Sequence, residues 1–337
     1  MQELTIPFTG RTAKKSEIEC RNFFGWIFGY KTYETTTNNF ELKNNVQYSE
    51  WRKNSSGQWC YLVYEYNIPD SLSKVTVTGN AHEYAFTNCK YLTCLSFSGN
   101  TTSIPAYDFF GGCQYLGTIV IGSKVTAVDG GIFAKSNRQM NIIIESGNTN
   151  YHSQNGCLIE TEAKKLICGN KYSTIPDDGS VTVIGESAFE GSYLEILDIP
   201  ECITKIENSA FADCHYLYKI NYYAKNCSVN STTFSNGNRV FYNAGSECSG
   251  ITLTIGKNVE RLHVCLFEPT YPISSHGPNV KTVIFEYGRK TEVLGFSAFN
   301  YMSNVKTVYY WGTKDDWDKI YRDYLFSSAV IHYRSST

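Results

Sequence analysis

One short phrase recurs along most of the chain, and it limits the possible folds more than any other feature of the sequence. Its clearest copy contains Ala188-Phe189 and the next contains Ala210-Phe211, which puts the two phenylalanines 22 residues apart. Further copies of this anchor stand at Ala85-Phe86, Phe109-Phe110, Ile132-Phe133, Leu266-Phe267 and Ala298-Phe299. A unit of this length cannot bury its apolar face alone, so we expect neighbouring units to stack around a shared core.

Each unit also carries a short segment with the alternation of a strand, such as Val75-Thr76-Val77 or Leu95-Ser96-Phe97. Stacked units would pair these strands into one long, mainly parallel sheet. The middle residue of each strand then points away from the core. These outward residues are Thr76, Ser96, Val120, Asp198, Asn221, Thr254, Ile284 and Tyr309.

The repeated residues resemble the BspA-type leucine-rich repeats of bacterial surface proteins. That pattern runs Ile-Gly-x-x-Ala-Phe-x-x-Cys-x-x-Leu-x-x-Ile-x-Ile-Pro, and the copy between residues 188 and 210 follows it closely, although it is one residue short and lacks the cysteine. The resemblance covers roughly residues 68–310. It implies a β-rich solenoid, and a non-catalytic cell-surface or secreted module for adhesion or protein binding, as family members are mostly described.

The phrase is interrupted, which suggests a division of the chain. We expect residues 1–8 to be the end of a truncated repeat, 9–67 an aromatic-rich insertion, 68–310 the repeat array, and 311–337 a C-terminal cap. The chain would then be a fragment of a longer array. Two stretches of 56 residues, from Phe133 to Phe189 and from Phe211 to Phe267, hold either a degenerate unit or an insertion.

The first of these stretches contains a predicted β-hairpin insertion near residues 155–170. Apolar residues 157–159 and 165–168 flank a polar four-residue loop, a pattern typical of a hairpin. Cys157 and Cys168 can oppose each other there, and whether they form a disulfide depends on a register that the sequence leaves open. The cysteines that recur with the repeat, Cys89, Cys113 and Cys214, are instead expected to be buried free thiols.

The insertion at 9–67 is the least repetitive part of the chain and the richest in aromatic residues. Its Phe24-Gly25-Trp26-Ile27-Phe28-Gly29 run resembles an insert of clostridial family members. Residues 46–51 and 59–66 flank Asn54-Ser55-Ser56-Gly57, which predicts a second hairpin. Exposed rings on that hairpin would be candidate partner-binding residues, with packing of the insertion onto the first repeat as the alternative. The candidate partner-binding residues are Trp51, Trp59 and Tyr64, together with Tyr309 on the strand face.

The C-terminal segment has the pattern of a helix followed by a strand. Thr313 and Asp316 have capping-box spacing, and Trp317, Ile320, Tyr321 and Tyr324 fall on one helical face. Residues 329–333 alternate like a strand. We therefore expect a helix-plus-strand cap, which makes the solenoid α+β at its ends.

Composition and motif searches exclude several classes of function. The net charge of −2 and the scattered basic residues argue against a nucleic-acid partner. No stretch of about 18 apolar residues predicts a membrane span. The N-terminus lacks the basic start and apolar run of a signal peptide, so we expect any signal and anchor to lie outside this sequence.

We predict no enzymatic activity, no metal and no cofactor. The six histidines have no zinc-site spacing, and no nucleophile elbow or phosphate loop is present. Cys214 beside His215 invites comparison with a nucleophile and its base, but Cys214 occupies the buried cysteine position of the repeat. The expected partner is a host or matrix protein, or a glycan bound by exposed aromatic rings in the alternative of a carbohydrate-binding module. The sequence sets no oligomeric state.

Overall fold

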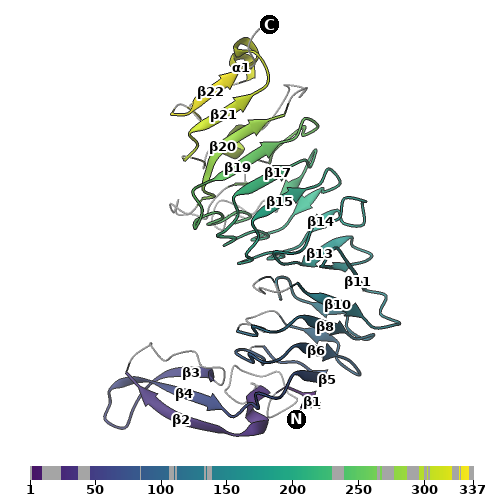
Figure 1. Cartoon of the computed structure of the whole chain (residues 1–337), viewed down its shortest axis with the longest axis vertical. Coiled ribbons are helices and arrows are strands. Elements are labelled where there is room, and N and C mark those ends of the chain that lie inside the picture. Colours follow the sequence, from purple (N-terminus) through teal and green to yellow (C-terminus); the bar gives the residue numbers. More distant parts are fainter. Residues whose placement is uncertain are drawn as a thin grey trace. The chain divides into compact units, whose positions relative to one another are not determined.

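Short strands dominate the computed structural model, which divides into two compact units, Met1–Ser153 and Gln154–Thr337 (Figure 1). The strands are mostly parallel and helices are few, so the predicted β-rich repeat fold is confirmed. The structure describes residues 2–9, 24–36, 46–83, 85–105, 110, 112–132, 134, 139–229, 239–263, 266–267, 277–286, 296–299, 302, 304–320, 326 and 328–333.

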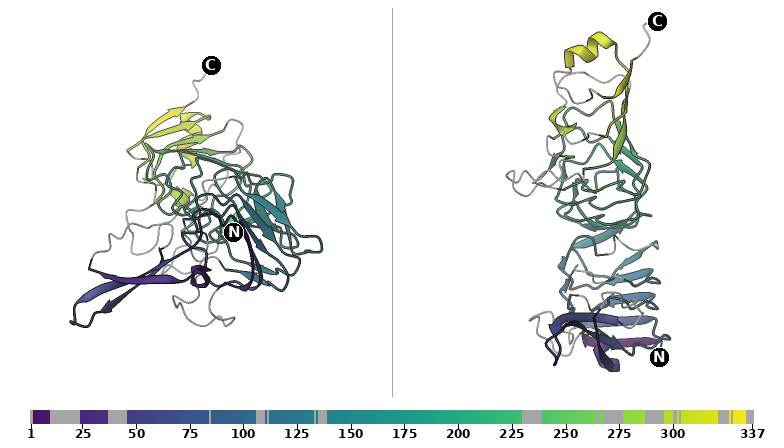
Figure 2. Two further views of the ribbon diagram at one scale, coloured as in Figure 1. Left: turned by 60° about the horizontal axis from the view of Figure 1, so that its bottom comes forward. Right: turned by 90° about the vertical axis from the view of Figure 1, so that its left-hand side faces the viewer.

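The first unit is built on a five-stranded parallel sheet, whose strands stack one above another (Figure 2). In spatial order these strands are β1 (Glu3–Phe8), β5 (Lys74–Asn80), β6 (Cys94–Phe97), β8 (Thr118–Ile121) and β10 (Asn141–Ile144). Apolar residues are in register along it, so Val75 pairs with Leu95 and Leu95 with Ile119. A two-stranded sheet, β7 (Ser103–Ile104) with β9 (Ala127–Val128), accompanies it.

The second unit is built on two sheets of six strands each. The first is parallel throughout and contains β15 (Ile196–Ile199), β17 (Lys219–Tyr222), β19 (Ile251–Ile255), β20 (Val280–Phe285), β21 (Thr307–Tyr310) and β22 (Val330–Tyr333). The second contains β11 (Tyr151–Gln154), β12 (Cys157–Glu160), β13 (Lys165–Cys168), β14 (Val183–Ile184), β16 (Lys205–Ile206) and β18 (Ser228–Val229). Its first strand, β11, spans the boundary between the units.

The single long sheet expected from the sequence is therefore a pair of main sheets, one in each unit. The reason lies in the chain between β10 and β15. There the residues form the predicted hairpin, with β12 antiparallel to β13, and β13 then pairs with β14 rather than with a strand of either main sheet. Cys157 and Cys168 are both buried and are not joined by the disulfide left open above. In the register, Cys168 pairs with Leu158 and not with Cys157.

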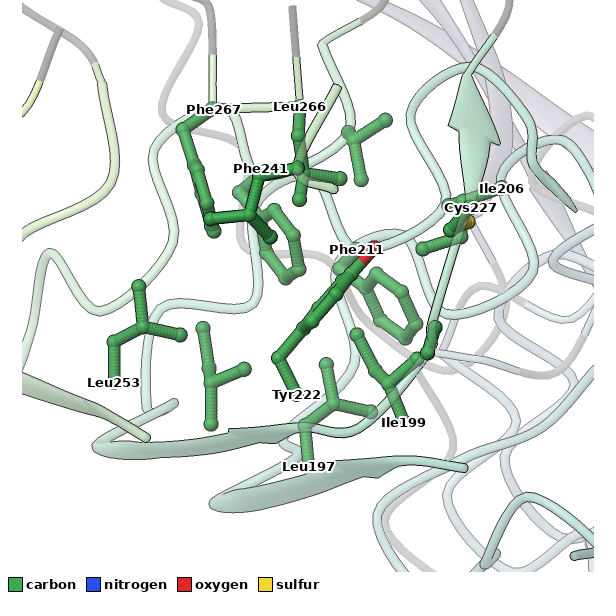
Figure 3. Close-up of a cluster of buried hydrophobic side chains, with 14 of the residues drawn as sticks. Leu197, Ile199, Ile206, Phe211, Tyr222, Cys227, Phe241, Leu253, Leu266 and Phe267 are labelled. Atoms are coloured by element: carbon green, nitrogen blue, oxygen red, sulfur yellow. The ribbon is translucent and has the colours of Figure 1, made fainter. Parts of the chain in front are cut away.

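The core of the second unit contains a continuous row of phenylalanine rings (Figure 3). Phe189 and Phe211 are buried, as predicted, and their centroids are 5.5 Å apart. The row continues from Phe211 to Phe241 at 5.3 Å, and from Phe241 to Phe267 at 5.2 Å. Phe299 follows Phe267 at 6.3 Å. The stretch between Phe211 and Phe267 thus holds a degenerate repeat, in which Val240-Phe241 replaces the Ala-Phe anchor. Phe133 lies outside the described residues.

The periodic cysteines Cys89, Cys113 and Cys214 are buried thiols that form no disulfide, as predicted. The Cys113 thiol donates a hydrogen bond to the carbonyl oxygen of Phe86 at 3.0 Å, and the Cys214 thiol donates to that of Phe189 at 3.2 Å. Each bond joins one repeat to the anchor of the repeat before it. Burial raises the pKa of Cys113 to about 12 and raises the pKa of Cys214 as well.

The C-terminal cap consists of the helix α1 (Lys314–Ile320) and the strand β22. The capping box is present, because the Asp316 N–H donates to Thr313 Oγ1 at 3.1 Å and the Thr313 N–H donates to Asp316 Oδ2 at 3.1 Å. Trp317 is buried, with its ring 5.0 Å from that of Tyr310. The side chain of Ile320, and Tyr321 and Tyr324, lie outside the described residues.

Candidate partner-binding surfaces

A three-stranded antiparallel sheet in the first unit carries most of the predicted binding residues. It consists of β2 (Tyr30–Thr35), β4 (Trp59–Tyr66) and β3 (Val46–Lys53), with β4 in the centre, and we call it the aromatic sheet. It extends away from the repeat strands β1 and β5 (Figure 1). The predicted hairpin of β3 and β4 is confirmed, whereas β2 was not predicted from the sequence.

The short helix η2 (Phe24–Phe28) fastens the aromatic sheet to the first repeat. Phe24 is fully buried, and its ring centroid lies 5.1 Å from that of the repeat anchor Phe86. The Phe24 N–H also donates to the Ala85 carbonyl oxygen at 2.8 Å. A second hydrogen bond joins the residue before β2 to the residue after β4, because the Asn67 N–H donates to the Gly29 carbonyl oxygen at 3.0 Å. Phe24 therefore packs the insertion against the repeat, while rings such as those of Trp59 and Tyr30 stay exposed to solvent.

The sheet places the predicted binding residues in different surroundings. Trp59 is 50% exposed, and Lys53 Nζ lies 5.4 Å from the centre of its ring. Tyr64 is half-buried, with its ring 5.6 Å from that of Tyr30. Because Trp59 and Tyr64 are an odd number of residues apart on one strand, they point to opposite faces. Trp51 pairs with Tyr61 through the backbone, and its side chain lies outside the described part of the structure.

Exposed aromatic residues on β2 were missed in the sequence analysis. Tyr30 is 42% exposed, and Tyr33 is exposed too. The Tyr30 ring stacks on that of Trp26, with centroids 4.9 Å apart. The signal that could have found this strand is the run Tyr30-Lys31-Thr32-Tyr33-Glu34-Thr35, which is rich in residues that favour strands and follows Gly29.

An ion pair crosses the aromatic sheet from one outer strand to the other. Arg52 Nη2 on β3 lies 3.0 Å from Glu34 Oε1 on β2. The Cys60 side chain on β4 lies near both groups, and burial, followed by the negative charge of Glu34, raises the pKa of its thiol. The neutral thiol is therefore favoured between these charges.

Tyr309, the fourth predicted residue, lies on the main sheet of the second unit and is 43% exposed. Its ring stacks on that of His332 with centroids 4.8 Å apart. Backbone pairing aligns it with other outward residues in one row across the sheet, and Asn221 donates a 2.6 Å hydrogen bond to Asp198 in that row. The row runs Asp198, Asn221, Thr254, Ile284, Tyr309 and His332. All eight residues predicted to point outward are half-buried or exposed, which confirms the strand register.

The described residues closest to a reactive site are His215 and its neighbour Cys214. His215 Nδ1 lies 2.8 Å from Ser246 Oγ, whereas the neighbouring Cys214 thiol is buried and bonded to the Phe189 carbonyl. A thiol whose pKa is raised by burial is a poor nucleophile. Among the described residues there is no group of three or more His, Cys, Asp or Glu side chains that could hold a metal ion. A search of the same residues found no helix long and apolar enough to span a membrane.

Register-matched parallel strands, stacked phenylalanine anchors and buried cysteines in successive units define a leucine-rich-repeat protein. The family model described as BspA type leucine rich repeat region matches residues 52–178 and 167–268, in six copies. These matches cover more than half of the sequence, and the chain belongs to the BspA-type leucine-rich-repeat family. No curated protein is significantly similar to it.

Solved structures of bacterial proteins match at low identity. The pneumococcal vaccine antigen PcpA is 16% identical, with 85% of this chain and 82% of that chain covered and a TM-score of 0.39. A leucine-rich repeat protein from Eubacterium ventriosum is 19% identical, with 71% and 73% covered and a TM-score of 0.39. A leucine rich cell surface protein from Faecalibacterium prausnitzii is 17% identical, with 75% and 82% covered and a TM-score of 0.36.

Proposed function

We propose that the protein is a non-catalytic, cell-surface or secreted module that binds a host or matrix protein through the aromatic sheet. The observation that carries the proposal is that Trp59 and Tyr30 are exposed, while Phe24 packs this element against the first repeat. Large rings that stay exposed on a rigid strand are typical of binding hot spots, because they give a wide contact at a small cost in conformational entropy. Membership of the BspA-type family supports the surface location.

The division of the chain is part of this proposal. Residues 9–67 would act as one inserted binding element, residues 68–310 as the supporting repeat array, and residues 311–337 as its cap. Insertions in repeat proteins commonly lie on a functional face, because they are free of the stacking that constrains the repeats. Tyr309 and His332 on the strand face form the second proposed contact surface.

A binding panel of host-matrix proteins, run on the full chain, tests the proposal. Once a partner is found, Trp59→Ala should weaken its binding by about tenfold or more, the range of a hot-spot residue. The matched control is Tyr172→Ala, which removes an exposed ring that also has a lysine above it, but in the second unit. Equal loss in both variants, or no loss in either, would count against the aromatic sheet.

Carbohydrate binding is the second candidate, and the exposed Trp59 ring favours it. An indole face can stack on a sugar ring, and Lys53 beside it can donate hydrogen bonds to hydroxyl groups. A glycan array run beside the protein panel separates the two candidates. Signal on the array that is lost in Trp59→Ala, with none on the protein panel, would replace the first proposal by this one.

A further inference from the structure

A groove of about 770 Å³ lies in the second unit, beside β15, the first strand of the sheet that ends at β22. One wall consists of β15 and the residues that follow it, up to Cys202. Residues 173–175 and 177 also line it, and Phe189 and Leu194 add apolar surface. All of the lining residues belong to the second unit.

The wall formed by β15 presents an unpaired strand edge to the groove. Among the residues that the structure describes, β15 is the terminal strand of its sheet and pairs with β17 alone. The carbonyl oxygens of Glu195 and Ile199 accept hydrogen bonds from the β17 side, so the alternate residues Ile196 and Asp198 direct their N–H and C=O groups away from it. In the part of the chain that the structure describes, no backbone hydrogen bond joins β15 to residues 173–177.

The groove is also acidic. Asp177, Asp198 and Glu201 line it, and none of its lining residues is Lys or Arg. Glu201 has partial compensation from Lys225, whose Nζ lies 3.5 Å from Glu201 Oε2. A hydrogen bond from Asn258, with smaller contributions from the charges of Lys225 and Lys257, lowers the pKa of Glu201. A cationic ligand is therefore favoured over an anionic one.

We propose that this groove binds an extended, basic peptide segment of a partner protein, which adds to the sheet as a further strand beside β15. Unpaired N–H and C=O groups of a strand edge are a template for such pairing, and side-chain contacts then select the sequence. Apolar side chains of the peptide would face Leu194 and Leu197, while alternate basic side chains would lie on the outer side with Asp198 and the 44% exposed Ile196. This site is separate from the aromatic sheet, so its test is independent of the proposal above.

The probe is a fluorescently labelled peptide of alternating lysine and valine, acetylated and amidated, titrated with the full chain and followed by anisotropy. We expect it to bind at least about tenfold more tightly than the same peptide with glutamate in place of lysine. Methylation of every backbone nitrogen should weaken binding by a similar factor, because it removes the donors that pair with the strand edge. Absence of binding by the lysine peptide, or equal binding of the methylated one, overturns the proposal.

Two variants place the peptide on β15. Ile196→Pro removes the N–H that faces the groove, and proline is tolerated on a strand edge where that group is not used in the ladder. Ile196→Ala is the matched control, since it shortens the side chain and keeps the N–H. The lysine peptide should bind Ile196→Pro about tenfold more weakly than Ile196→Ala, with equal circular dichroism spectra for both proteins. Equal affinities would put the peptide elsewhere and sink the assignment.

Discussion

The ring of Phe211 lies between those of Phe189 and Phe241, at centroid distances of 5.5 and 5.3 Å and interplanar angles of 19° and 12°. The one anchor ring of this repeat therefore contacts the anchor rings of the repeats on both sides. Near-parallel rings at this spacing add to the energy of burying them, because offset aromatic pairs attract each other beyond their shared area. The row links three repeats that are separated in sequence by 22 and 30 residues.

Phe211→Ala should lower the free energy of unfolding by about 3–5 kcal/mol, the range for truncation of a buried phenylalanine. The loss arises from the missing ring and from the cavity that both neighbouring rings then face. Urea denaturation followed by circular dichroism measures it. Tyr172→Ala is the control, because that ring is exposed. A loss below about 1 kcal/mol in Phe211→Ala would contradict the packing described here.

A methyl group at Gly169 should destabilise the core by overpacking it, whereas Phe211→Ala leaves a cavity. A Cβ atom there would lie 2.5 Å from Phe189 Cε1 and 2.7 Å from Cζ, so the ring must move. We expect Gly169→Ala to cost about 1–3 kcal/mol, as for other overpacked cores. At Gly117 the nearest heavy atom would be 4.0 Å away, so Gly117→Ala should change stability by no more than about 0.5 kcal/mol. A similar stability of Gly169→Ala and Gly117→Ala in thermal denaturation would show that the Phe189 ring moves aside without strain.

Stability at high pH should depend on the buried thiol of Cys113. Its pKa rises from 9.0 in the unfolded chain to about 12 in the folded protein, because burial disfavours the thiolate. The folded state thus holds this proton more tightly, and the resulting stability is complete below pH 9 and lost as the pH rises from 9 toward 12. Relative to Cys113→Ala, the wild type should lose about 1.4 kcal/mol per pH unit in that window.

Urea titrations at several pH values between 8 and 11 measure this slope. The half-buried Cys94 provides the control, since its thiol is less shielded from water and Cys94→Ala should change the slope less. Parallel pH profiles for wild type and Cys113→Ala would show that the thiol is not buried in solution.

The capping box of α1 gives a prediction for the C-terminal cap. Thr313→Ala removes the hydroxyl that accepts from the Asp316 N–H, and should destabilise the helix by about 1 kcal/mol. Thr313→Ser keeps the hydroxyl and should cost a few tenths of that. Amide hydrogen exchange of Trp317, whose N–H donates to the Thr313 carbonyl at 3.1 Å, reports the local opening. Equal exchange rates in the two variants would rule out a role for the cap.

The sequence was sufficient for features that depend on neighbours along the chain. The buried anchors follow from the repeat of about 22 residues, whereas the outward strand residues, the hairpins and the capping box follow from patterns of a few residues. Phe241 was missed because it lies 30 residues from Phe211 rather than 22. The Phe241 ring nevertheless packs in the same row, with its centroid 5.3 Å from that of Phe211.

The candidate sites were harder to predict because they depend on lateral neighbours. That Trp59 and Tyr64 face opposite ways follows from strand alternation alone. That β2 joins the other side of β4, and that β15 has no second partner strand within the described residues, depends on which segments meet in space. The repeat period of the sequence does not say which segments meet in space, so the groove beside β15 could not be predicted from it.

The order of the strands also determines how the second unit responds to tension. Hydrogen bonds between β17, β19 and β20 run along the direction in which the repeats succeed one another. A force pulling in that direction loads these bonds one strand pair after another, and the phenylalanine rings part in the same sequence. We therefore expect the unit to unfold and lengthen in many small steps at low force, one strand pair at a time, rather than in a single event.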